Sequence, residues 1–100
     1  MVFKLNYIIC SAIWFDDGKE YPHQPKNITT GYVVTGRRHH NCFMTHTILK
    51  GEKSEKGIEP IQGFISSNDL FLDRKQASEF AFNACQIDSD DGKLFSEDLY

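Results

Sequence analysis

Short runs of apolar and β-branched residues, separated by turn signals, are the main pattern along this chain. Five runs have the length and composition that are typical of β-strands. Asp16-Asp17-Gly18 separates the first two runs, and Pro22 and Pro25 follow the second, so 23–30 is expected to be a loop. The strands are predicted at 3–15, 19–21, 31–36, 61–66 and 70–72.

Two further segments carry apolar residues at helical spacing. The first covers about 40–50 and ends before Gly51. The second begins after Asp73, which is placed to N-cap it, and Gln76 three residues later completes a capping box. Its buried stripe is expected to contain Ala77, Phe80, Ala81 and Ala84. The predicted order β-β-β-α-β-β-α indicates an α+β protein, a mostly antiparallel sheet flanked by two α-helices.

The composition fits a single domain over residues 1–100 and narrows the class of ligand. Apolar residues make up 40% of the chain and charged residues 25%, with a net charge of −3. Such an acidic chain is unsuited to coating polymeric nucleic acid or an anionic membrane, so a local basic site favours one small anion. No apolar run is long enough to span a bilayer, and we expect no signal peptide. Three cysteines without a disulfide framework indicate a reducing compartment.

The turn Gly36-Arg37-Arg38-His39 is the strongest candidate for binding. It joins the strand at 31–36 to the first helix, whose first turn has unpaired N–H groups and the positive end of the helix dipole. Arginines at that place add forked, charged donors that match phosphate or carboxylate. The alternative is that Arg37 and Arg38 are solvated surface charges paired with nearby acids.

Three residues of the first helix support a competing metal hypothesis. His39, Cys42 and His46 stand at i, i+3 and i+7, which places them on one helical face, and thiolate and imidazole ligands suit zinc. The helix supplies no carboxylate, and Cys42 equally fits a buried apolar position. A Cys–His nucleophile built on Cys42 is a further alternative, although nothing marks an oxyanion hole.

Two other positions have both a functional and a structural interpretation. Phe64 follows Gly63 on a predicted strand, where it is either a stacking platform for a base or a core residue. Asp73 and Arg74 open the second helix, where capping and solvation explain them without a ligand. They nevertheless form a second helix start that is favourable to anions.

Taken together, four motifs resemble a known protein family. They are Gly36-Arg37-Arg38-His39, Gln62-Gly63-Phe64, Phe71-Leu72-Asp73-Arg74 and Leu94-Phe95-Ser96-Glu97-Asp98-Leu99. This arrangement is similar to short phage proteins of the first type of the Thoeris anti-defence family. Those proteins are sponges that sequester the immune signal glyco-cyclic ADP-ribose without cleaving it, and some members also take up cyclic oligonucleotides.

The resemblance implies an antiparallel sheet with two helices, assembly as dimers or trimers of dimers, and pockets between protomers in an infected bacterial cytoplasm. At matching positions it implies that Arg37 and Arg38 clamp phosphate and that Phe64 stacks on a base. Asp73 or Arg74 would contact ribose or phosphate. The segments 51–60 and 86–93 do not align, so ligand contacts from them stay unassigned.

The leading hypothesis is therefore non-enzymatic capture of a small cyclic nucleotide, with no catalytic residues and no cofactor. Its predicted binding residues are Arg37, Arg38, His39, Phe64, Asp73 and Arg74. The alternative is a metal-dependent hydrolase of such a nucleotide that uses His39, Cys42 and His46. A third hypothesis is an interaction protein whose acidic surface blocks a host enzyme.

Two segments carry expectations about motion and assembly. The polar stretch 51–60 predicts a mobile surface loop that is suited to act as a lid. The tail 94–100 is unusually apolar for a terminus, so it is expected to dock on the sheet or on a second protomer. We therefore expect a homo-oligomer.

Overall fold

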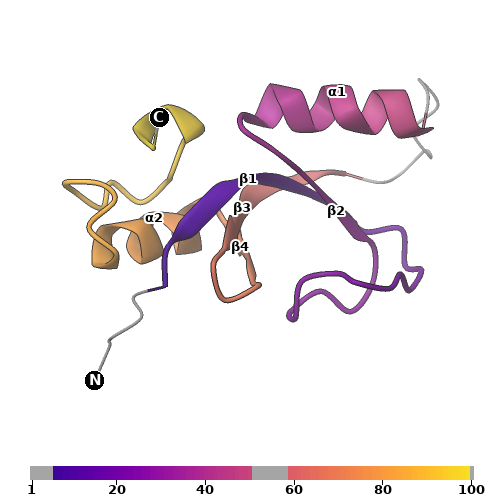
Figure 1. The fold of residues 1–100 in the computed structure, drawn as a ribbon, viewed down its shortest axis with the longest axis horizontal. Helices are drawn as coiled ribbons and strands as arrows, with labels where there is room; N and C mark the ends of the chain where they lie inside the picture. The colour runs from indigo at the N-terminus through magenta and orange to yellow at the C-terminus, as the bar shows by residue number, and fades with distance from the viewer. Residues whose placement is uncertain (1–5, 51–58, 100) are drawn as a thin grey trace.

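The protein folds around one four-stranded antiparallel sheet, as the computed structural model of residues 6–50 and 59–99 shows (Figure 1). The strands follow the order β2-β1-β3-β4 across the sheet. Two α-helices and a short 3-10 helix complete the described part of the chain, so the predicted α+β class is confirmed. The elements are β1 (Ile8–Phe15), β2 (Tyr32–Gly36), α1 (His39–Lys50), β3 (Ile61–Ser66), β4 (Phe71–Asp73), α2 (Arg74–Asn83) and η1 (Ser96–Asp98).

The strand register places the main core residues on one face of the sheet. Ser11 pairs with Phe64, and Phe64 pairs with Leu72, so these three side chains share a face. Ile13 stands two residues from Ser11 on β1 and pairs with Val34, which puts both on that same face. The face is therefore mostly apolar, with Ser11 and Gln62 as polar members.

Two core clusters cover the two ends of this face. The cluster under α1 contains Ile13, Phe15, Val34 and Cys42, and the cluster under α2 contains Ile8, Phe64, Leu72, Ala77, Ala81 and Leu94. Figure 1 shows α1 and α2 toward opposite ends of the sheet, with the C-terminal segment close to the start of α1. The covered face is thus shared between two helices rather than spanned by one.

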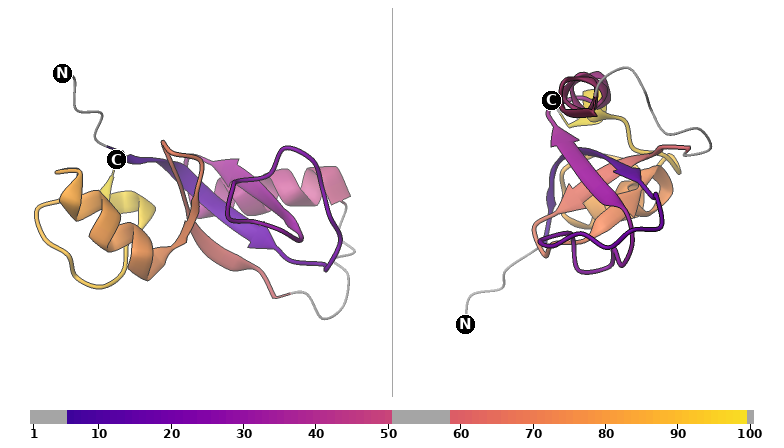
Figure 2. Two further views of the ribbon diagram at one scale, coloured as in Figure 1. Left: turned by 90° about the horizontal axis from the view of Figure 1, so that it is seen from below. Right: turned by 90° about the vertical axis from the view of Figure 1, so that its right-hand side faces the viewer.

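The opposite face is covered in part by the loop between β1 and β2. Seen along the long axis of the molecule, α1 lies on one side of the sheet and this loop on the other (Figure 2). The indole N–H of Trp14 donates to the carbonyl of Thr30 (2.9 Å), and the Asn27 amide donates to the carbonyl of Phe71 (2.7 Å). These bonds fix the loop predicted at 23–30 against the sheet.

The strand predicted at 19–21 is wrong, and the first strand begins at Ile8, within the range predicted for it. Side-chain oxygens of Asp16 and Asp17 accept the backbone N–H groups of Gly18 (3.1 Å) and Lys19 (2.9 Å). Because these turn amides bind carboxylates, the segment does not extend into a paired strand. The order of elements is consequently β-β-α-β-β-α.

The start of the second helix is confirmed in detail. Asp73 is its N-cap: the Asp73 carboxylate accepts the Gln76 N–H (2.8 Å), and the Gln76 side chain accepts the Asp73 N–H (3.1 Å). Past the end of this helix, the side-chain amide of Gln86 binds both backbone groups of Ile8, at 2.7 Å to the N–H and 2.9 Å to the carbonyl. The amide thereby takes the place of a neighbouring strand at the start of β1.

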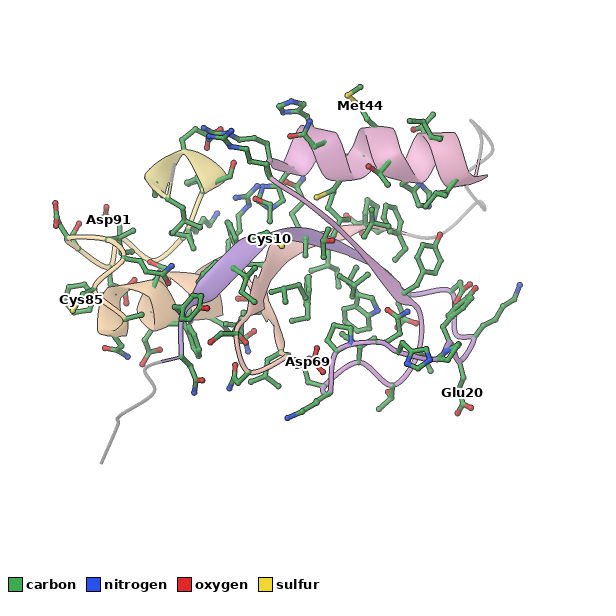
Figure 3. The ribbon with its side chains drawn as sticks, in the orientation of Figure 1. Cys10, Glu20, Met44, Asp69, Cys85 and Asp91 are labelled. Atoms are coloured by element: carbon green, nitrogen blue, oxygen red, sulfur yellow. The ribbon has the colours of Figure 1, made fainter. Side chains whose placement is uncertain are left out.

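The C-terminal tail docks on its own chain. Leu94 is fully buried beside α2, and its N–H donates to the Arg74 carbonyl (2.8 Å). The homo-oligomer predicted from the tail stays a prediction. The outer side of α1 exposes the apolar side chains of Met44, Ile48 and Leu49, and Met44 points away from the sheet (Figure 3).

Two further predictions concern the lid loop and membrane-spanning segments. Most of the loop proposed as a lid, 51–58, lies outside the residues that the structure describes. Within the described ranges, no helix has the length and apolar character needed to cross a membrane.

Replacing Leu94 by alanine tests the docking of the tail. Because Leu94 is fully buried, we expect Leu94→Ala to lower the free energy of unfolding by roughly 2–5 kcal/mol, measured by urea denaturation. Ile48→Ala, on the exposed side of α1, serves as the control and should change stability little. Equal effects of the two substitutions would contradict the described packing of the tail.

Candidate anion-binding site

The basic turn before α1 is held in place by the sheet and by the helix that follows it. The Ser11 hydroxyl donates to the Arg37 carbonyl (3.1 Å), and the Arg38 N–H donates to the Asn41 side chain (3.2 Å). Gly36 permits this close approach, since a Cβ there would lie 3.2 Å from the Cys42 nitrogen. These hydrogen bonds fix the backbone of both arginines. The side chain of Arg37 is exposed, and that of Arg38 is half-buried.

His39, the first residue of α1, lies buried over Phe64 at the border of the two core clusters. Its Nε2 is 2.8 Å from the Gly63 carbonyl, and its ring meets the Phe64 ring edge-to-face at 5.1 Å. Because a carbonyl only accepts hydrogen bonds, Nε2 carries the hydrogen and Nδ1 is the acceptor. Nδ1 lies 3.4 Å from an Arg74 Nη2, which donates to it.

The environment of His39 favours its neutral form. Burial lowers its pKa below the usual 6.5, and the neighbouring Arg74 charge lowers it further. The Gly63 carbonyl and the Glu97 carboxylate act in the opposite direction without reversing the shift. His39 is therefore a neutral link between the starts of the two helices.

Arg74 connects the start of α2 to the tail. Its guanidinium donates to the Leu94 carbonyl (2.8 Å) and to the Gln62 side chain (2.6 Å), and lies 4.6 Å from the centre of the Phe95 ring. A cation over an aromatic face is attracted by the ring quadrupole. Arg74 thus fixes the tail beside His39.

A carboxylate from the tail completes this group. Glu97 Oε1 lies 3.8 Å from Arg38 Nη1, with side-chain exposures of 73% for Glu97 and 25% for Arg38. Burial lowers the pKa of Arg74 as it lowers that of His39, and the Glu97 charge opposes both shifts without reversing them. Figure 3 shows side-chain nitrogens gathered between the start of α1 and the C-terminal segment. Arg38 therefore lies beside one acidic side chain of the tail, and Arg74 binds the same tail at Leu94 and Phe95.

The six predicted binding residues have different outcomes. Arg38, His39 and Arg74 come together at this junction, and Arg37 precedes them on the exposed turn. The stacking role predicted for Phe64 is wrong, because the ring is 0% exposed beneath His39 and α2. The Asp73 carboxylate is exposed and serves as the α2 N-cap.

The predicted metal ligands do not form a common site. His46 Nε2 binds the Tyr32 hydroxyl (2.7 Å) and its ring stacks on Phe15 at 3.8 Å. The Cys42 Sγ lies 3.4 Å from the Arg38 carbonyl, and burial and the nearby Cys10 raise the pKa of Cys42 to about 11, so it is a thiol at neutral pH. Across residues 6–50 and 59–99, no three His, Cys, Asp or Glu side chains gather so as to hold a metal ion.

A separate pocket of about 260 Å³ lies where the end of α2 meets the tail. Its lining is mostly polar and carries more acidic than basic groups: Ser78, Gln86, Ile87, Asp88, Ser89, Asp91, Lys93 and Asp98. In Figure 3, Cys85 and Asp91 mark this end of the molecule. An acidic lining disfavours phosphate, so this pocket does not fit the predicted ligand.

Comparison with known proteins adds a family assignment. The family model described as "Phage T4 y16D protein" matches residues 7–100. The chain belongs to the phage T4 y16D protein family. No curated protein and no solved structure matches it. The family assignment supports a phage origin, and its description names no activity.

Three residues of this candidate site in the y16D-family protein received no role in the sequence analysis: Gln62, Phe95 and Glu97. Their roles depend on the docking of the tail next to Arg74, which no local periodicity encodes. The motif from Leu94 to Leu99 was a partial signal, since it alternates buried and exposed residues between 94 and 97.

The neutral state of His39 leads to a testable pH dependence. Its folded pKa is lowered, so between that value and 6.5 the unfolded chain binds more protons and stability falls as pH falls. We expect the unfolding free energy to decrease from pH 7.5 to pH 5 more in the wild type than in His39→Gln, which retains a donor for Gly63. Parallel pH profiles of the two proteins, measured by urea denaturation, would contradict the assignment.

Proposed function

We propose that this phage protein binds a small phosphorylated nucleotide and holds it without cleaving it. The carrying observation is that Arg38 lies 3.8 Å from the Glu97 carboxylate, while Arg74 holds the same tail through the Leu94 carbonyl and the Phe95 ring. A site that attracts one oxyanion from its own chain has the charge and donor type to attract another. The resemblance to cyclic-nucleotide sponges is a second, independent support.

The chemistry of the junction suits phosphate in particular. Guanidinium groups offer paired donors that match two oxygens of a phosphate, and charge-assisted bonds of this kind are stronger than neutral ones. The first turn of α1 adds the positive end of a helix dipole beside Arg37 and Arg38. Because the chain carries a net charge of −3, this attraction is local and favours a compact ligand over a polyanion.

For the base of a nucleotide we propose Phe95 in place of Phe64. The Phe95 side chain is 46% exposed and lies beside Arg74 at the junction. Arg74 covers one side of the ring, and a base would stack on the other. A phosphate near Arg38 and a base on Phe95 would place the ligand across the gap between α1 and the tail.

Binding is favoured over turnover by the states of the candidate reactive groups. His39 uses both ring nitrogens in contacts with Gly63 and Arg74, and Cys42 is a buried thiol. Neither arrangement offers a general base or a nucleophile to a ligand at the surface. The proposed role is therefore sequestration of a cyclic nucleotide immune signal, such as a cyclic ADP-ribose isomer, in the cytoplasm of the infected host.

The direct test is recovery of the ligand. The purified protein is incubated with a panel of cyclic nucleotides, separated from unbound material and denatured, and the released compound is identified by mass spectrometry. We expect about stoichiometric recovery of one intact nucleotide. Release of a linear or hydrolysed product over many turnovers would support the hydrolase instead.

Substitutions of Arg38 locate the site when the affinity for the recovered nucleotide is measured by calorimetric titration. If Arg38 binds phosphate, Arg38→Ala should weaken affinity by about 10- to 100-fold, since a charged hydrogen bond contributes about 1.5–3 kcal/mol. Arg38→Lys should recover part of the loss because it restores charge but not the planar fork. Unchanged affinity in both variants would place the ligand elsewhere.

The role of Phe95 has a matched control in Phe82, an α2 phenylalanine with 44% exposure against 46% for Phe95. Phe95→Ala should weaken nucleotide binding by about 5- to 100-fold, the range expected for loss of one stacked base. Phe82→Ala should leave the dissociation constant unchanged in the same calorimetric titration. Equal affinities of the two variants would rule out stacking on Phe95, and thermal melts without ligand would report any loss of tail docking.

A further inference from the structure

We propose that Glu97 acts as a built-in competitor that occupies the anion site in the absence of ligand. This inference rests on the proposed function and concerns its regulation. If Glu97 competes in this way, the ligand must be an anion with more negative charge than a single carboxylate. An incoming phosphate would displace Glu97 from Arg38.

The position of the carboxylate is the first argument. Glu97 Oε1 lies 3.8 Å from Arg38 Nη1, and its charge reaches both His39 and Arg74. One negative group therefore lies next to Arg38, the side chain proposed to bind phosphate. A second anion placed there would be repelled as long as Glu97 stayed in position.

The second argument is that the backbone of the tail is held by hydrogen bonds while the Glu97 side chain is exposed. Within η1 the Asp98 carboxylate accepts the Phe95 N–H (2.9 Å), and the Ser96 carbonyl accepts the Leu99 N–H (3.1 Å). Ser96 is buried, whereas the Glu97 side chain is 73% exposed. The backbone is thus fixed while the carboxylate is free to rotate, so Glu97 can leave Arg38 without unfolding the tail.

The weakness of the Glu97–Arg38 contact is the third argument. At 3.8 Å the two charges form no hydrogen bond, and the exposed Glu97 carboxylate is open to screening by water and salt, although Arg38 Nη1 itself is buried. A phosphate with two charges and several acceptor oxygens forms more and shorter bonds to guanidinium. Displacement is therefore favourable for phosphate and close to neutral for a simple carboxylate, which gives the site its selectivity.

The test is a calorimetric titration of four proteins with inorganic pyrophosphate at low salt. The proteins are the wild type, Glu97→Gln, Glu79→Gln and Arg38→Ala. Glu79 is exposed on α2, so its substitution removes the same charge from the chain away from the junction. We expect Glu97→Gln to bind about two- to fivefold more tightly than the wild type, in line with the small contribution of an exposed ion pair. Glu79→Gln should match the wild type, and Arg38→Ala should bind much more weakly.

The outcomes separate the competitor from the site itself. Unchanged or weaker pyrophosphate binding in Glu97→Gln, with binding still lost in Arg38→Ala, overturns the competitor and leaves the anion site standing. Equal gains in Glu97→Gln and Glu79→Gln also overturn it, because net charge then explains the effect. Absence of binding in the wild type and in every variant overturns both the proposed function and this inference. Thermal melts without ligand check that Glu97→Gln retains the wild-type fold.

Discussion

The contact of His39 with Gly63 and Arg74 is the interaction on which the rest of this structure depends. The apolar face of the sheet is too long for one of these helices, so α1 and α2 each cover an end of it. His39 fills the border between them: its ring rests on Phe64, one nitrogen binds the sheet and the other faces the second helix. Only a neutral ring can donate to a carbonyl and accept from an arginine at the same time, so the charge state of one side chain is part of the fold.

The meeting of the two helices at His39 explains why Arg38 and Arg74 lie close together. Both helices begin at the border, so Arg38 and Arg74 follow from the positions of the helix starts. The same geometry brings the tail between them, since Arg74 binds the Leu94 carbonyl. A chain of net negative charge thereby brings Arg38 and Arg74 to one place although no run of Lys and Arg in the sequence is longer than two.

Features that depend on residues close together in the sequence could be predicted from it. Features that depend on the packing of distant segments against one another could not. The Asp73–Gln76 capping box lies within four residues and was predictable from side-chain chemistry alone. Phe64 was ambiguous because Ile61, Phe64 and Ile65 place apolar groups on both faces of β3, so only pairing with Ser11 decides which face is covered. The contacts of Arg38 and Arg74 with the tail join distant segments, and local periodicity carries no information about them. The strand predicted at 19–21 does not form for another reason. The carboxylates of Asp16 and Asp17 bind the N–H groups of Gly18 and Lys19, which a paired strand would otherwise use.

The amide of Gln86 has a consequence for the behaviour of the protein at high concentration. β2 pairs with β1 only from Ser11 onward, so the beginning of β1 would otherwise present backbone donors and acceptors to another molecule. By binding both groups of Ile8, Gln86 closes this open edge with a single side chain. Exposed edges are sites at which sheets of different molecules join and aggregate. One glutamine at the right distance from α2 therefore blocks pairing of this edge with the sheet of another molecule.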